Sequence, residues 1–191
     1  MNDSNGLLVV ISGPSGVGKS TIAHAIEQRL DAVFSVSMTT RQKTPKETEG
    51  VDYFFVTEPA FARAIDNNDL LEHAKVFDHS YGTPRKFVDE QIAAGRIVVL
   101  EIDIEGGIQV RANHPNAFML FILPPSKDDL LNRLRLRGRE SEDKIQRRYQ
   151  EHEREVKRAK DTGAYDHFVI NDDLDATIEK VISMIEERRK A

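Results

Sequence analysis

The sequence of 191 residues contains no cysteine, which excludes both a disulfide framework and thiolate chemistry. No apolar run approaches the roughly 20 residues that a membrane-spanning helix needs. The first residues, MNDSNG, lack the basic and apolar regions of a signal peptide. The net charge of −5 gives no overall support for a protein that binds nucleic acid or an anionic membrane. We therefore expect a cytoplasmic protein with no nucleic-acid or membrane partner, and the oligomeric state stays open.

Apolar stretches rich in β-branched residues alternate with amphipathic stretches along most of the chain. Strands are predicted at 7–12, 32–37, 96–103, 117–123 and 167–170. Helices are predicted at 19–30, from Pro84 to near Gly95, from Ser126, at 141–162 and at 173–189. This alternation predicts an α/β domain with a mostly parallel sheet.

Two polar segments, at roughly 37–83 and 133–160, interrupt the alternation and are interpreted as lobes that project from the core. In the first, strands at 51–56 and 70–77 flank a short helix at 58–67. The spacing leaves no room for crossover helices, so a small antiparallel or mixed sheet is expected.

The stretch GPSGVGKS, directly after the first predicted strand, matches the phosphate-loop pattern G-x-x-x-x-G-K-[ST]. Glycines let successive backbone N–H groups converge on phosphate oxygens, and the following helix points its positive end at them. Lys19 would reach the β- and γ-phosphates, and the Ser20 hydroxyl would bind Mg²⁺. The residues predicted to bind the triphosphate are Gly13, Pro14, Ser15, Gly16, Val17, Gly18, Lys19, Ser20 and Thr21.

A phosphate loop alone is compatible with a switch GTPase, an ATPase motor or a kinase of a small acceptor. The guanine-reading motif N-K-x-D of GTPases is not found, and the chain is short for a motor. A kinase of a small acceptor is therefore favoured, with the acceptor bound by the first polar lobe.

Motifs spread over residues 7–186 resemble those of guanylate kinases. They are S-V-S-x-T-T-R and G-x-D-Y-x-F within 35–55, then E-H-A, S-Y-G-T-P-R, L-E-I-D-I, R-G-R-E and N-D-D-L. The resemblance implies a P-loop NTPase-type three-layer core with a parallel sheet, a small mixed-sheet GMP-binding lobe and a helical lid. The expected boundaries are 6–36, 87–125 and 161–190 for the core, 37–86 for the lobe and 126–160 for the lid. It also implies phosphoryl transfer from ATP to GMP, with Mg²⁺ accompanying ATP and no tightly bound organic cofactor.

The resemblance assigns roles residue by residue. The GMP phosphate would be held by Ser37, Arg41, Tyr53 and Tyr81, and the guanine edge would be read by Glu72, Thr83 and Asp103. Catalytic cations would be Lys19, Arg41 and the lid residues Arg137 and Arg148, while Asn171 and Asp172 would lie beside the adenine of ATP. A carboxylate suits guanine because it accepts from N1–H and the exocyclic amino group together, a pair that adenine lacks.

Each of these residues also has an ordinary structural interpretation. Glu72 and Arg41 could be solvated, the two tyrosines could be core or rim aromatics, and Asp103 could cap a helix or interact with Mg²⁺-bound water. The arginine-rich run RLRLRGR at 133–139 could be a solvated helix end or a patch for RNA. A peptide-binding module without catalysis and a sugar-phosphate kinase remain the alternative functions.

Several positions depart from the family pattern, among them Arg139 and the stretch DHS at 78–80, and two are considered further. Thr44 stands where a second acceptor-site arginine is usual, which predicts a weaker grip on the GMP phosphate. Glu105 stands where glutamine is common, and the sequence offers no physical explanation for it.

Overall fold

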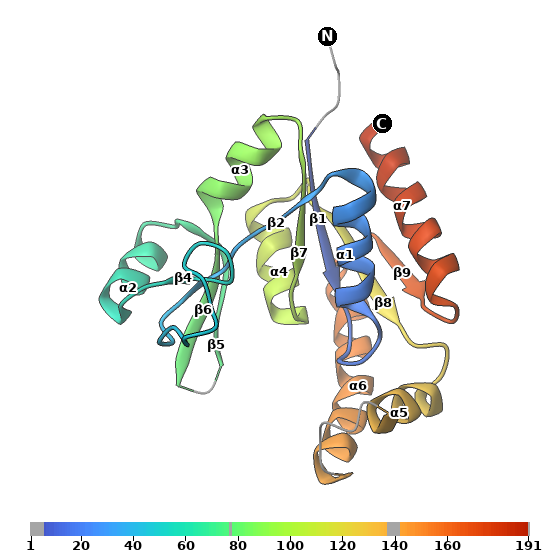
Figure 1. The fold of residues 1–191 in the computed structure, drawn as a ribbon. Helices are drawn as coiled ribbons and strands as arrows, with labels where there is room; N and C mark the ends of the chain where they lie inside the picture. Colours follow the sequence, from blue (N-terminus) through green and yellow to red (C-terminus); the bar gives the residue numbers. More distant parts are fainter. Residues whose placement is uncertain (1–5, 77, 137–141, 191) are drawn as a thin grey trace.

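The structure, a computed structural model, describes residues 6–76, 78–136 and 142–190 (Figure 1). Its central sheet has five parallel strands in the order β2-β7-β1-β8-β9. The strands are β1 (Leu7–Ser12), β2 (Val33–Phe34), β7 (Ile97–Glu101), β8 (Phe118–Leu123) and β9 (His167–Ile170). The predicted α/β class with a parallel sheet is confirmed.

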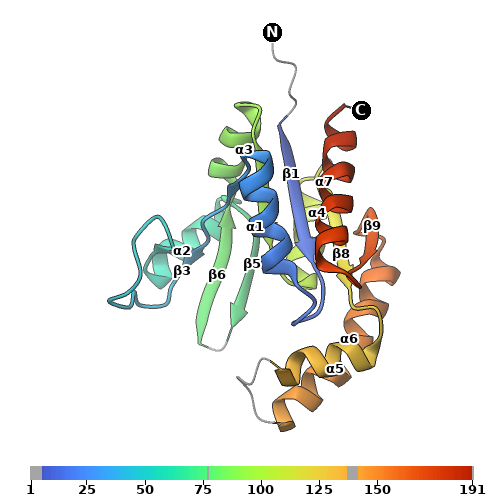
Figure 2. The ribbon, with the colours of Figure 1, turned by 45° about the vertical axis from the view of Figure 1, so that its right-hand side comes forward.

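Helices cover both faces of this sheet, which makes three layers (Figures 1 and 2). Val9 and Ile11 of β1 pack toward α1 (Lys19–Leu30) and α7 (Leu174–Lys190). Leu8 and Val10 pack on the other face, toward α3 (Arg85–Ala93), α4 (Ile104–Asn113) and α6 (Glu142–Thr162). Successive side chains of a strand point to opposite faces, so a strand buried on both faces is apolar throughout.

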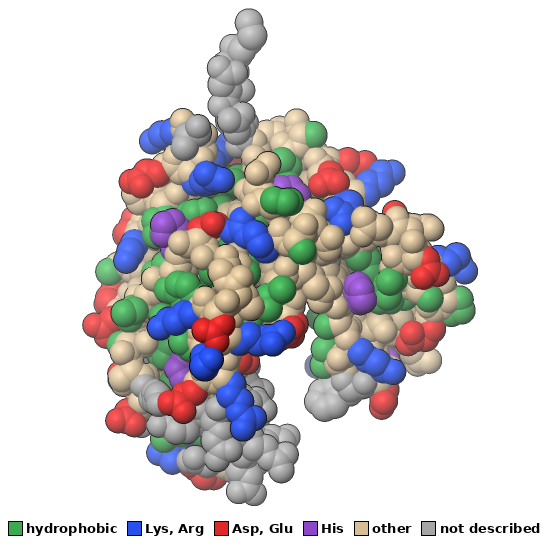
Figure 3. All heavy atoms as spheres, turned by 180° about the vertical axis from the view of Figure 1, so that it is seen from behind, with side chains coloured by type: hydrophobic (Ala, Val, Ile, Leu, Met, Phe, Trp, Pro, Cys, Tyr) green, Lys and Arg blue, Asp and Glu red, His purple; other side chains and the backbone are tan. Residues whose placement is uncertain are grey.

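A second, mixed sheet forms a lobe beside the core. Its strands are β3 (Met38–Thr39), β4 (Phe54–Phe55), β5 (Leu70–Val76) and β6 (His79–Pro84), in the order β4-β3-β6-β5. Helix α2 (Glu58–Asp66), capped by the Thr57 hydroxyl, packs Phe61 and Ala64 against Leu70 of this sheet. In the space-filling view a deep notch opens at the lower edge of the molecule, beside this lobe at the right, and the lobe joins the core above it (Figure 3).

Helices α5 (Lys127–Leu136) and α6 pack against each other at the opposite side of the notch (Figure 2). The predicted cap at Ser126 is present, since its Oγ accepts a hydrogen bond from the Asp129 N–H at 3.1 Å. Within the described ranges, no helix combines the length and the apolar character needed to cross a bilayer.

The local sequence patterns do not predict three of the elements, and they predict two of the strands to be longer than they are. Strands β3 and β6 and helix α4 were not predicted, while the strands expected at 32–37 and 51–56 shorten to β2 and β4. Helix α4 contains adjacent glycines, which lower helix propensity, and Gly107 is needed because a Cβ there would lie 2.3 Å from the Tyr165 hydroxyl. Tertiary packing, rather than local helix propensity, therefore determines that this segment is helical.

Candidate active site

The carboxyl ends of the parallel strands meet at one edge of the core sheet. Gly13 follows β1, Glu101 ends β7 beside Ile11, and Asn171 follows β9. Gly13 has a φ of +142°, and a Cβ there would lie 2.3 Å from the Ile122 carbonyl oxygen. Only glycine therefore lets the chain leave β1 in this direction.

The phosphate loop is present in the predicted place, between β1 and the first turn of α1. The ammonium group of Lys19, which begins α1, donates to the carbonyl oxygens of Gly13 at 2.6 Å and Pro14 at 3.0 Å. The lysine therefore lies over the loop whose N–H groups would face a phosphate, next to the helix N-terminus.

Asn171, which follows the edge strand β9, supports this loop through a hydrogen bond. Its side chain is 3% exposed, and its Nδ2 donates to the Val17 carbonyl oxygen at 2.7 Å. At Gly18, with a φ of +100°, a Cβ would lie 2.7 Å from the same nitrogen. The structure thus places the Asn171 side chain against the phosphate loop, and the next residue, Asp172, is exposed.

Glu101 is a candidate site residue that the sequence analysis missed. The Ser20 hydroxyl donates to its Oε1 at 2.8 Å. Hydroxyl and carboxylate oxygens are donors that suit Mg²⁺ when triphosphate oxygens complete the coordination, so this pair fits the expected metal. The described residues contain no cluster of three histidine or acidic side chains that could hold an ion by themselves. The signal that could have found Glu101 is an acid ending the strand next to the phosphate-loop strand.

A buried carboxylate lies in the mixed sheet where its strands face α4. Glu72 on β5 is 8% exposed, and its Oε1 accepts a hydrogen bond from the Thr83 hydroxyl of β6 at 2.7 Å. Burial raises the pKa of Glu72, the Thr83 hydroxyl opposes this, and the charge of Asp103 raises it further.

Asp103 reaches the same place from the core. Its Oδ1 accepts from the Gly106 N–H at 2.8 Å and so caps α4, while a Cβ on Gly106 would lie 3.2 Å from Glu72 Oε2. The cap is one of the interpretations left open from the sequence. The structure brings together the three residues predicted to read guanine, two from the mixed sheet and one from the N-terminal cap of α4.

The predicted phosphate ligands gather at the other strands of the lobe. The rings of Tyr53 and Tyr81 meet edge to face at 5.9 Å, and the Arg41 guanidinium lies 5.3 Å from the Tyr53 ring centre. Ser37 precedes β3, and its carbonyl oxygen accepts from the Phe54 N–H of β4 at 2.9 Å. The four residues therefore lie close together in one region of the mixed sheet.

The structure describes little of the two arginines that are expected in the lid. Arg137 lies outside the described residues, as does Arg139, and Arg148 lies on α6 with an undescribed side chain. An ion pair between Arg135 Nη2 and Glu142 Oε1, at 2.5 Å, joins the facing ends of α5 and α6.

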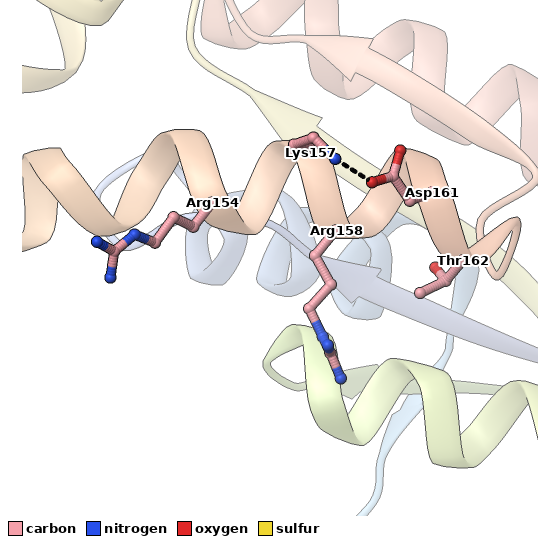
Figure 4. Close-up of a pocket in the computed structure, with 5 residues that line it drawn as sticks. All are labelled: Arg154, Lys157, Arg158, Asp161 and Thr162. Atoms are coloured by element: carbon pink, nitrogen blue, oxygen red, sulfur yellow. Dashed lines mark hydrogen bonds and ion pairs between the residues drawn. The ribbon is translucent and has the colours of Figure 1, made fainter.

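Glu105, which the sequence left unexplained, ties α4 to α6. Its carboxylate receives Arg158 Nε at 2.5 Å and Nη2 at 2.8 Å. Arg158 lies in a surface hollow of about 330 Å³ along α6, lined also by Arg154, Lys157, Asp161 and Thr162 (Figure 4). Figure 4 shows Arg158 extending from α6 toward α4, so the pair links α6, which lies mostly in the expected lid segment, to the helix capped by Asp103.

A phosphate loop at the strand ends, with a serine–carboxylate pair beside it, defines the chain as a P-loop nucleotide-binding protein. The buried carboxylate Glu72 lies in a second sheet outside this core, as expected for a kinase of a small acceptor.

Comparison with known proteins agrees with this class. The family model described as "Guanylate kinase" matches residues 5–188. The chain is 46% identical to a guanylate kinase of Caldanaerobacter subterraneus, over 94% of this chain and 86% of the relative. It is 43% identical to one of Photorhabdus laumondii, over 96% and 89%. A crystal structure of guanylate kinase from Anaplasma phagocytophilum superposes with a TM-score of 0.71 at 30% identity, covering 98% of this chain and 88% of that one. The chain belongs to the guanylate kinase family and is an enzyme.

Proposed function

We propose that the chain catalyses Mg²⁺-dependent transfer of the γ-phosphoryl group of ATP to GMP, giving ADP and GDP, and so recycles GMP in purine nucleotide metabolism. The observation that carries the proposal is the convergence of Glu72, Thr83 and Asp103 in a chain that keeps an intact phosphate loop. A peptide-binding module has no need of that pairing.

On the donor side, the loop N–H groups and Lys19 hold the triphosphate at the start of α1. Ser20 and Glu101 would hold Mg²⁺, which supplies charge neutralisation for the phosphates when bound. Lys19 leaves its two loop carbonyls for phosphate oxygens, a move that its flexible stem permits. Asn171 keeps the loop in its phosphate-binding shape.

On the acceptor side, Glu72 in its ionised form accepts the two donors on the guanine edge. Thr83 occupies Oε1 of this carboxylate with its own hydroxyl, which fixes the direction in which Oε2 points. Asp103, anchored through Oδ1 by its helix, offers its other oxygen to the base. At the far end, the phosphate of GMP would meet Arg41 and the two tyrosine hydroxyls.

Transfer itself needs positioning and cations more than a general base, because the charge of the transferring group is spread over its equatorial oxygens. Lys19 and Arg41 approach it from the two sides, and Arg137 and Arg148 would come from the lid. We propose that segment 126–160 closes as this lid, that 37–86 is the acceptor lobe, and that closure excludes water which would otherwise hydrolyse ATP.

The test is a coupled assay of ADP release with GMP, AMP, CMP, UMP and ribose phosphates as acceptors. Turnover restricted to GMP is the expected result. Equal rates with AMP and GMP would contradict the assignment of the notch to guanine. Preference for a ribose phosphate would favour the sugar-phosphate kinase, and absence of turnover would favour the binding module.

A further inference from the structure

The guanidinium of Arg41 is already held on one side by a carboxylate of its own loop. Arg41 Nη2 donates to Glu47 Oε1 at 2.5 Å, and Nη1 donates to Glu47 Oε2 at 3.0 Å. The two side chains are only 24% and 19% exposed, so water competes weakly for these hydrogen bonds. The pair is a fork-to-fork contact, which fixes direction as well as distance.

Glu47 is fixed in turn by Thr44. The Thr44 N–H and the Thr44 hydroxyl each donate to Glu47 Oε2 at 2.8 Å. The hydrogen bond from Arg41, followed by the one from the Thr44 N–H, lowers the pKa of Glu47 to about 2. The carboxylate is therefore charged and immobilised at neutral pH.

The remaining contacts define the plane of the guanidinium. Arg41 stacks over the rings of Tyr53 and Phe55, at 5.3 and 5.6 Å from their centres. Nη1 also donates to the Gln42 carbonyl oxygen at 3.0 Å. The pKa of Arg41 is raised first by its hydrogen bond with Glu47 and, to a smaller extent, by a hydrogen bond with the Tyr81 side chain, so Tyr81 lies beside the guanidinium.

We propose that Glu47 is a positioning residue: held by Thr44, it fixes one edge of the Arg41 guanidinium so that the side next to Tyr81 is presented to the phosphate of the acceptor nucleotide. This inference rests on the proposed function and deepens it. Glu47 touches no substrate, since a second anion beside the phosphate would repel it; it acts through Arg41. Because position 44 is a threonine and not a second arginine, the orientation of the single arginine, Arg41, becomes more important.

The experiment compares steady-state constants of Glu47→Gln with those of the parent enzyme. Glutamine keeps the shape but loses the charge and one acceptor, so Arg41 is released from its fork contact. We expect KM for GMP to rise about tenfold, the effect of one lost charged hydrogen bond, with KM for ATP unchanged. Thr44→Val, which removes only the hydroxyl, should raise KM for GMP about threefold. The matched control is Glu49→Gln, because Glu49 lies in the same loop and accepts from the Phe55 N–H instead of from Arg41.

Dependence on Arg41 is tested by a double-mutant cycle. In an Arg41→Lys background the fork contact does not exist, so Glu47→Gln should have no further effect on KM for GMP. An equal effect in both backgrounds would mean a general loop defect and would overturn the proposal. A lower KM for GMP in Glu47→Gln would mean that Glu47 competes with the phosphate, which also overturns it.

A ligand-free measurement separates failure of this proposal from failure of the proposed function. Side-chain NMR of ¹⁵N-arginine-labelled protein should show separate Arg41 Nη signals in the parent chain and in Glu49→Gln, because rotation is hindered. They should merge in Glu47→Gln. Persistence of separate signals there would overturn the positioning role, whatever acceptor the enzyme uses.

Discussion

The sharpest prediction concerns Glu72→Gln. Thr83 donates to Glu72 Oε1, so the amide oxygen of the glutamine should occupy that position and keep the bond. The amide nitrogen then replaces Oε2 and turns a donor toward the two donors of guanine. The loss of a charged hydrogen bond with an opposed donor costs about 3 kcal/mol, or roughly 100-fold in KM for GMP.

The same substitution should stabilise the free protein. The pKa of Glu72 is raised above its ordinary value of 4.5, so the folded chain holds this proton more tightly than the unfolded chain does. Stability contributed by the protonated form is complete below 4.5 and is lost as pH rises through the folded-state pKa. A neutral amide removes this loss, and a gain of about 1 kcal/mol would raise Tm at pH 7 by roughly 2–4 °C.

Acidification provides a third signature of Glu72, since only the ionised carboxylate accepts both guanine donors. KM for GMP of the parent enzyme should rise as pH falls toward the raised pKa, whereas KM of Glu72→Gln should lack this dependence. The coupled assay and a thermal melt measure all three effects, with Asp66→Asn, an exposed carboxylate on α2, as control. A change in KM for GMP below threefold in Glu72→Gln would refute the assignment, and a lowered Tm would refute the argument from burial.

Four further substitutions test other parts of the site. Arg137→Ala should lower kcat by about 10³-fold or more while GMP still binds by calorimetry; an unimpaired kcat would remove it from the mechanism. Glu101→Gln should raise the Mg²⁺ concentration for half-maximal rate, and an unchanged Mg²⁺ titration would contradict its role beside Ser20. Asn171→Ala should lower Tm by roughly 2–4 °C and raise KM for ATP, through the lost bond to the phosphate loop. Thr44→Arg should raise kcat/KM for GMP above that of Thr44→Val, which lacks the same hydroxyl; equal values in the two variants would show that the missing arginine is of no consequence.

The core could be predicted from the sequence wherever a local pattern was sufficient. The run at 7–12 is buried on both faces and so had to be apolar throughout, and α1 begins and ends as its spacing predicts. Strand β6 could not be predicted because its sequence HSYGTP shows no apolar alternation. Helix α4 could not be predicted because its adjacent glycines oppose a helix. Packing against Tyr165 and pairing with β5 supply what local propensity lacks.

The candidate site likewise has one part that the sequence predicts and another that depends on the tertiary structure. The phosphate loop is one contiguous stretch, so its residue types and their spacing by themselves predict where a triphosphate would bind. The pairing of Ser20 with Glu101, the bracing of Val17 by Asn171 and the tie between Glu105 and Arg158 join residues 81, 154 and 53 positions apart. Only strand order and the packing of helices across the sheet decide such contacts, because no local periodicity encodes the distance between segments that are remote in the chain.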